Sequence, residues 1–117
     1  MDLKLRDEIN RLHAQFCSGL ADPNRILILY TLAAHPTNVS ELAEQLSIPQ
    51  PTASRHLKVL KERGMVVSNR QGQSVIYQVA DDRILEALDL LRAILADSLE
   101  TQIALARTAS QSFTKTD

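Results

Sequence analysis

Side chains that can hydrogen-bond to nucleic-acid bases gather in one segment, between residues 50 and 63. Within it, Ala53, Leu57 and Leu60 recur at helical spacing and form an apolar stripe, which turns the polar residues to the opposite face. Arg and Gln can make paired hydrogen bonds to base edges, Ser and Thr reach bases or phosphates, and Lys suits the phosphate backbone. The candidate set is Gln50, Thr52, Ser54 and Arg55 near the helix start, with Lys58 and Lys61 further along.

Charge is concentrated in the same part of the chain. The whole sequence has a net charge of −1, but residues 50–73 carry five basic residues against one acidic residue, Glu62. This basic segment, flanked by mildly acidic ones, is consistent with phosphate binding. The alternative is an ordinary solvated helix face.

A predicted β-hairpin follows the polar helix. Residues 65–70 and 74–79 are rich in Val and Ile, and the Gly in Arg70-Gln71-Gly72-Gln73 suits a tight turn. Its tip would present Arg70, Gln71 and Gln73, which could reach the flanking backbone or a minor groove.

The rest of the chain reads as helices that position these two elements. A tight turn at Ser47-Ile48-Pro49 joins a short helix to the polar one, and Asp81-Asp82 caps a long last helix. The resulting fold class is mainly α with one β-hairpin, a winged helix-turn-helix of order α-α-α-α-β-β-α. We predict a single domain over residues 1–117, frayed from about 108, with helices at 4–19, 23–35 (buried), 39–46 and 50–63.

The last helix has an apolar stripe that a domain of this size cannot cover alone. Leu91 and Leu95 lie in this stripe, which runs from Ile84 towards Ile103. A helix of about 25 residues is roughly 40 Å long. We therefore interpret the stripe as a dimer interface rather than a ligand pocket.

Composition excludes several classes of protein. Aromatic residues make up 3% and apolar residues 44%, so the core must be built from Leu, Ile, Val and Ala. A single cysteine, Cys17, excludes an internal disulfide and an all-cysteine metal cage. The longest apolar run, Ile26–Tyr30, is too short to span a membrane, and the N-terminus lacks an apolar signal segment, so we expect no membrane partner and a cytoplasmic location.

Several motifs together resemble the ArsR/SmtB family of dimeric repressors in bacteria and archaea. Asp22–Leu29 is similar to the family pattern D-P-x-R-x-x-I-L, and Val39–Ala43 and Gln50–Leu60 follow it. The similarity covers about residues 8–100. It implies a homodimer built from the first and last helices, a double-stranded DNA operator, and a small-molecule or redox effector that weakens operator binding.

The sequence departs from the metal-sensing members of that family. Arsenic-type members have Cys-Val-Cys where this chain has Asn38-Val39-Ser40. At the zinc-type positions it has Asp81, Arg83, Ile94 and Asp97, which supply two carboxylates and no imidazole, a poor set for a transition metal. We therefore expect no metal site and no cofactor.

The remaining chemically active side chains have simple structural interpretations. Cys17 is expected to be a buried small hydrophobe, with a redox or effector role as the alternative. His13 lies four residues before it, but no third ligand is evident, and His35 marks a helix end. His56 lies near the buried stripe, which favours packing or a hydrogen bond over base contact, and Glu41 is expected to act only in capping.

These observations predict a sequence-specific DNA-binding transcriptional regulator, acting as a homodimeric repressor on an inverted-repeat operator. The alternative is a winged-helix protein-interaction module that uses the basic helix face, although such an interface more often centres on an aromatic anchor. No nucleophile–base pair, phosphate-binding glycine loop or metal triad is present, so we do not expect an enzyme.

Overall fold

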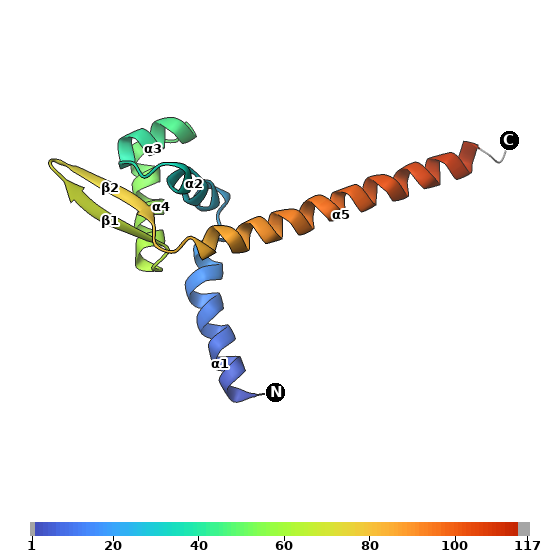
Figure 1. The fold of residues 1–117 in the computed structure, drawn as a ribbon, viewed down its shortest axis with the longest axis horizontal. Coiled ribbons are helices and arrows are strands. Elements are labelled where there is room, and N and C mark those ends of the chain that lie inside the picture. Colours follow the sequence, from blue (N-terminus) through green and yellow to red (C-terminus); the bar gives the residue numbers. More distant parts are fainter. Residues whose placement is uncertain (1, 115–117) are drawn as a thin grey trace. The chain divides into compact units, whose positions relative to one another are not determined.

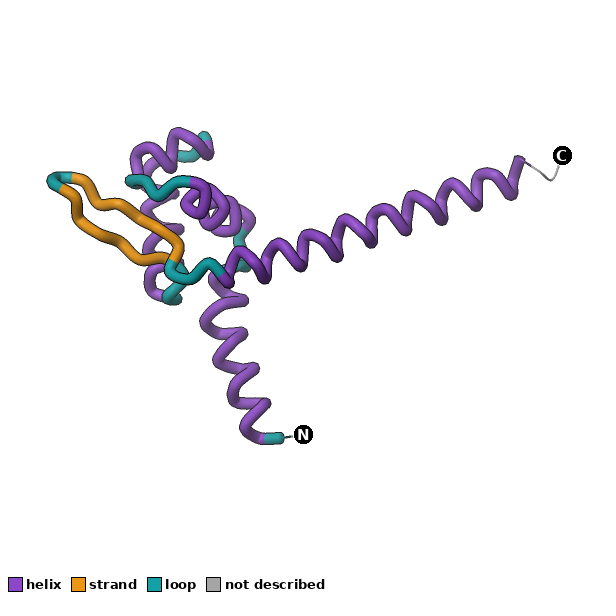
Figure 2. Tube along the Cα trace, viewed as in Figure 1, coloured by secondary structure: helices purple, strands orange, loops and turns teal. Residues whose placement is uncertain are grey.

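The computed structural model describes the backbone of residues 2–114, and it confirms the predicted fold class (Figures 1 and 2). The residues group into two compact units, one ending at Leu85 and the other beginning at Glu86. The sequence predicts a single domain, and this division into units does not test that prediction. The elements are α1 (Leu3–Leu12), η1 (His13–Cys17), α2 (Pro23–Ala34), α3 (Val39–Leu46), α4 (Gln50–Glu62), β1 (Val66–Gln71), β2 (Ser74–Val79) and α5 (Arg83–Thr114).

The first helical segment contains a turn that the sequence does not predict. Asp2 caps α1, its carboxylate accepting a hydrogen bond from the Lys4 N–H at 3.0 Å. The helix then passes into η1, where the backbone adopts π-helical pairing and the Ser18 N–H donates to the His13 carbonyl. The predicted helix at 4–19 is thus confirmed in extent, but its second half contains a turn that is wider than an α-helix.

Short polar caps fix the starts of the next two helices. The Asp22 carboxylate accepts from the Asn24 N–H at 2.8 Å and starts α2. The Asn38 side chain accepts from the Glu41 N–H at 2.8 Å and starts α3. Both caps satisfy backbone donors that have no partner inside the helix.

The turn between α3 and α4 depends on a left-handed backbone at Ser47, where φ is 55°. This conformation ends α3 and reverses the chain within three residues, so that α4 begins at Gln50 and the two helices contact one another. The tight turn predicted at residues 47–49 is confirmed.

The core of the first unit lies where α2, α3 and α4 meet the start of the hairpin. The sequence predicts that α2 is buried, and this holds for one face only: Ile28, Leu29 and Leu32 are buried, while Leu27 is 51% exposed. The fully buried side chains are Ile28, Leu29, Leu32, Leu42, Leu57, Leu60, Met65 and Val66, all apolar and none aromatic, as the composition requires.

The hairpin is antiparallel, with Val66 opposite Val79 and Gln71 opposite Ser74. Its loop is Gly72-Gln73, because β1 continues one residue further than predicted, and Gly72 takes a positive φ of 64°. An isolated bridge between Thr37 and Tyr77 ties β2 to the chain just before α3.

The last helix, α5, is described to Thr114, and its 32 residues extend about 48 Å. The sequence predicts fraying from about residue 108. The structure describes a helix up to Thr114, and residues 115–117 lie outside the described range, so the fraying stays a prediction. Among the described residues, none of the helices has the length and apolar character needed to cross a membrane. The exposed apolar side chains of α5 are Leu90, Leu91, Ile94, Leu95, Leu99, Ile103 and Leu105.

Gly64 links α4 to β1 through a backbone conformation that other residues adopt at a cost. Its φ is 74°, and a Cβ there would meet only the Gln15 amide at 3.5 Å, an ordinary contact. Gly64→Ala should therefore lower the free energy of unfolding by about 1–2 kcal/mol, from backbone strain alone. Urea denaturation tests this, and a Gly64→Ala variant as stable as the wild type would contradict it.

Candidate nucleic-acid interface

Helix α4 has one buried and one exposed face. Ala53, Leu57 and Leu60 are at most 1% exposed and pack into the core. The other face is open to solvent, because burial of these three residues fixes the rotation of the helix about its axis. It carries the predicted residues Gln50, Ser54, Arg55, Lys58 and Lys61, all exposed, while Thr52 is half-buried at its edge.

At the start of α4, Arg55 and Thr52 are already oriented together. The Arg55 Nη2 donates to Thr52 Oγ1 at 3.3 Å, within one helical turn. This is a long bond between exposed groups, so the guanidinium remains available to a ligand. The remaining donors of the guanidinium can form the two-pronged contact that guanine O6 and N7 accept.

At the other end of α4, Lys61 joins the helix to the hairpin. Its Nζ donates to Ser68 Oγ on β1 at 2.7 Å, and both belong to the basic segment found in the sequence. The hairpin tip carries Arg70, Gln71 and Gln73, all exposed. The Lys61–Ser68 hydrogen bond thus joins α4, which carries one group of candidate residues, to the hairpin, whose tip carries the other.

Sequence reasoning missed a role for Arg25. Its Nε donates to the Gly19 carbonyl at 2.7 Å and its Nη2 donates to the Ser18 carbonyl at 3.2 Å. Its Nη1 lies 3.4 Å from His56 Nδ1 on α4. The sequence favours packing or a hydrogen bond for His56, and this contact agrees with the second of these. The Arg of the D-P-x-R motif was the one sequence feature that could have indicated this role. Its acceptors could not be predicted, because they include backbone carbonyls, which have no residue pattern.

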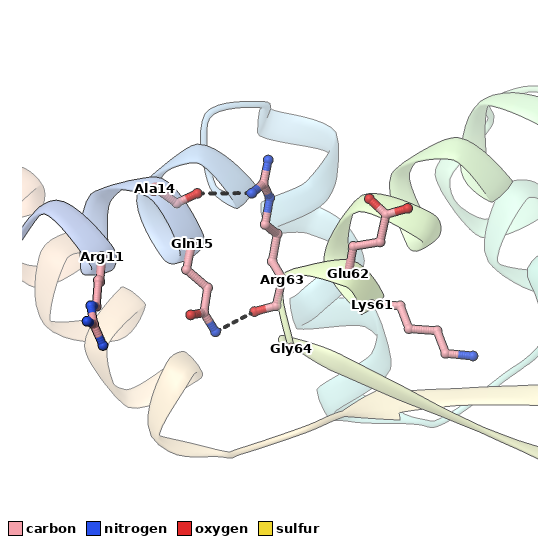
Figure 3. A pocket seen from close by; sticks show the side chains of 7 residues that line it. All are labelled: Arg11, Ala14, Gln15, Lys61, Glu62, Arg63 and Gly64. Carbon is pink, nitrogen blue, oxygen red and sulfur yellow. Dashed lines mark hydrogen bonds between the residues drawn. The ribbon is translucent and has the colours of Figure 1, made fainter.

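An open pocket lies where the first helical segment meets the end of α4 (Figure 3). The Gln15 side-chain amide donates to the Arg63 carbonyl at 3.0 Å, and Arg63 Nη1 donates to the Ala14 carbonyl at 3.1 Å. This contact was not predicted. The lining residues are Arg11, Ala14, Gln15, Lys61, Glu62, Arg63 and Gly64.

Two further expectations about side chains need correction. Cys17 is exposed in this chain, not buried, and neither α1 nor η1 contributes a buried residue. Glu41 does more than cap, since its carboxylate accepts a hydrogen bond from the Thr37 hydroxyl across the start of α3.

Two of the four positions that correspond to zinc ligands in the resembled sensors, Asp81 and Arg83, form an ion pair. Arg83 Nη2 lies 2.7 Å from Asp81 Oδ2, and the hydrogen bonds from Arg83 lower the pKa of Asp81 from 3.8 to about 2. The guanidinium already neutralises the carboxylate that a cation would need. Over the described residues, His, Cys, Asp and Glu side chains do not gather in threes close enough to hold a metal ion.

Known proteins share this arrangement and much of its sequence. Residues 22–68 match the family model described as "Bacterial regulatory protein, arsR family". An uncharacterised helix-turn-helix transcriptional regulator of Mycobacterium tuberculosis, Rv0081, is 33% identical over 100 residues, which are 88% of its length. Its crystal structure superposes with a TM-score of 0.73 over 81% of this chain. The chain belongs to the ArsR family.

Two further proteins are similar to this ArsR-family chain. The SmtB repressor of M. tuberculosis is 39% identical over 77 residues, 66% of this chain and 57% of that protein. The homodimeric winged helix-turn-helix DNA-binding domain of Mb0332 from Mycobacterium bovis is 25% identical over 86% of this chain, with a TM-score of 0.74 and 92% of its own length covered. The chain spans about three-fifths of the length of the first curated relatives, 63% of NmtR and 57% of SmtB. The family is one of regulators, in agreement with the prediction that the chain is not an enzyme.

Proposed function

We propose that this chain is a homodimeric transcriptional repressor whose α4 helix enters the major groove of each half of an inverted-repeat operator. The observation that carries the proposal is the exposed face of α4, which is polar apart from Pro51 and is fixed by the burial of Ala53, Leu57 and Leu60. A helix of this kind reads DNA when its N-terminal residues can meet base edges.

Within that face the residues divide by chemistry. Gln50, Thr52, Ser54 and Arg55 lie in the first turns of α4 and are assigned to bases. Lys58 and Lys61 are assigned to phosphates, as are Arg70, Gln71 and Gln73 at the hairpin tip, which could also reach a flanking minor groove. The Lys61–Ser68 bond supports one continuous surface for this purpose.

A protein-interaction module is the competing function for the same face. Such a surface more often centres on a buried aromatic anchor within a pocket. Neither the exposed face of α4 nor the hairpin tip carries an aromatic residue, and both are rich in amide and basic side chains. This composition favours nucleic acid.

The homodimer is proposed from the exposed apolar side chains of α1 and α5. On α1, Leu5, Ile9 and Leu12 are 46–50% exposed, and on α5, Leu91 and Leu95 are each 60% exposed. Stripes of this length are rarely left in water. The M. bovis relative, described as homodimeric, supports a second copy of this chain as their partner.

The effector proposed for this repressor does not act through the two metal sites of the resembled sensors. Asn38 and Ser40 offer no thiolate, and Asp81 is paired with Arg83. Cys17 is the single thiol of the sequence, and its exposure on the first helical segment makes it the candidate for a redox response.

DNA binding is tested directly by selection from a random duplex pool, followed by titration at several salt concentrations. We expect an inverted repeat with half-site centres about 10 bp apart or a multiple of that spacing. Affinity should fall steeply with salt because phosphate contacts release counterions. Recovery of no common sequence, or binding that salt does not weaken, would count against the proposal.

Arg55 and Lys61 should separate base reading from phosphate binding. Arg55→Ala should cost about 1–3 kcal/mol of operator binding and relax the preference at one base pair. Lys61→Ala should weaken all sequences about equally. Ser68→Ala is the matched control, since it removes the Lys61–Ser68 bond but leaves the charge. If Arg55→Ala lowers specific and non-specific binding by the same factor, Arg55 contacts only phosphate.

The proposed dimer interface is tested by Leu91→Glu combined with Leu95→Glu. Two carboxylates buried without partners should dissociate the dimer and abolish operator binding. Ala93→Glu combined with Ala104→Glu adds the same charge to the opposite face of α5 and should leave the dimer intact. Sedimentation measures both. A Leu91/Leu95 variant that sediments as a dimer would place the interface elsewhere.

Zinc, cadmium and arsenite at stoichiometric concentration should leave operator affinity nearly unchanged, since neither metal site has its ligands. Any response to oxidants should disappear in Cys17→Ser. Both are measured by operator titration of wild-type and variant protein. A strong metal response that persists in Cys17→Ser would contradict this account, and would point to a site built from oxygen and imidazole ligands.

A further inference from the structure

The first helical segment and α4 are joined by hydrogen bonds that belong to neither helix alone. At the end of α4, Gln15 donates to the Arg63 carbonyl and Arg63 donates back to the Ala14 carbonyl, at 3.0 and 3.1 Å (Figure 3). The two bonds run in opposite directions, so each segment both donates to the other and accepts from it.

The π-helical turn provides one of these acceptors. In an α-helix the Ser18 N–H would donate to the Ala14 carbonyl, but here it donates to the His13 carbonyl. The Ala14 carbonyl instead accepts from Ser18 Oγ at 2.5 Å and from Arg63. Such turns are frequent at functional positions in helices. Here the turn leaves the Ala14 carbonyl able to accept a hydrogen bond from Arg63 at the end of α4.

Arg25 makes a second connection nearer the middle of α4. Its guanidinium holds the carbonyls of Ser18 and Gly19, at the end of the first segment, and lies against His56 Nδ1 on α4. A guanidinium is only a donor, so the His56 nitrogen must accept. One side chain of α2 therefore contacts both segments.

Close packing reinforces both connections. Gly19 is buried, and a Cβ there would lie 2.9 Å from the Sδ of Met65, which is itself fully buried. The same Cβ would lie 3.5 Å from Arg63 Cγ. The absence of a side chain at Gly19 thus lets the first segment approach the residues that end α4.

We propose that Gln15, Arg25 and Arg63 are positioning residues that set which half-site spacing the dimer accepts, an inference that rests on the proposed function. The first segment lies in the proposed dimer interface, and α4 is proposed to meet DNA. A rigid link between them transmits the dimer geometry to the two reading helices, whose separation must match the helical repeat.

These residues act through protein contacts rather than by touching DNA. Arg25 and Arg63 are only half-exposed, and Arg63 Nε is buried without a hydrogen-bond partner among the described residues. Their donors are directed to carbonyls of the first segment. Removing these contacts should change the dimer's discrimination between half-site spacings more than its affinity for a single half-site.

The test compares the selected operator with operators that have one base pair inserted or removed between the half-sites. The measured quantity is the ratio of affinities for selected and altered spacing. In Gln15→Ala combined with Arg63→Ala we expect this ratio to fall by about tenfold, within the range for residues of one hydrogen-bond network. Arg63→Lys, which restores a donor, should recover part of it.

Arg11→Ala is the matched control, because Arg11 lines the same pocket but pairs with Asp7 on its own helix, so the ratio should not change. Gln15→Ala alone removes an exposed side chain and should shift the ratio less, in the same direction, if the double variant fails to fold. A wild-type ratio with no preference for spacing, or an unchanged ratio in folded Gln15→Ala, would overturn the inference. Failure of the wild type to bind any inverted repeat would instead overturn the proposed function.

Discussion

Burial of Ala53, Leu57 and Leu60 is the interaction on which the rest of the structure depends. A helix of 13 residues is not stable alone in water, so α4 exists because this stripe packs against α2 and α3. The same burial fixes the rotation of the helix. It therefore decides that Arg55 and Lys58 face solvent, without any interaction of their own being needed to hold them there.

The turns that flank α4 hold the helix in this packing. The left-handed Ser47 brings α3 back beside α4, and the left-handed Gly64 sends the chain into β1. Lys61 then links the helix to the hairpin by its hydrogen bond to Ser68. The result is a small rigid surface of amides and basic groups on the first unit, while the apolar stripe of α5 belongs to the second.

Much of this could be predicted from the sequence, because the relevant signals are local. Helical spacing locates α2, α3 and α4. Caps at Asp22 and Asn38 mark the starts of α2 and α3, and the change to alternation locates the hairpin. The connections of Arg25 and Arg63 could not be predicted. Their acceptors are backbone carbonyls far away in sequence, which have no residue signature, and a π-helical turn leaves the apolar spacing almost unchanged. The exposure of Cys17 was missed as well, since helical spacing does not show how much of the first segment the core covers.

Protection of operator DNA from dimethyl sulfate tests the central claim most directly, since the reagent methylates guanine N7 in the major groove and adenine N3 in the minor groove. The account predicts that the bound protein protects guanine N7 at two dyad-related half-sites, and that Arg55→Ala removes this protection at one guanine of each. Protection confined to adenine N3, or none at guanine N7 under saturating protein, would contradict the placement of α4 in the major groove.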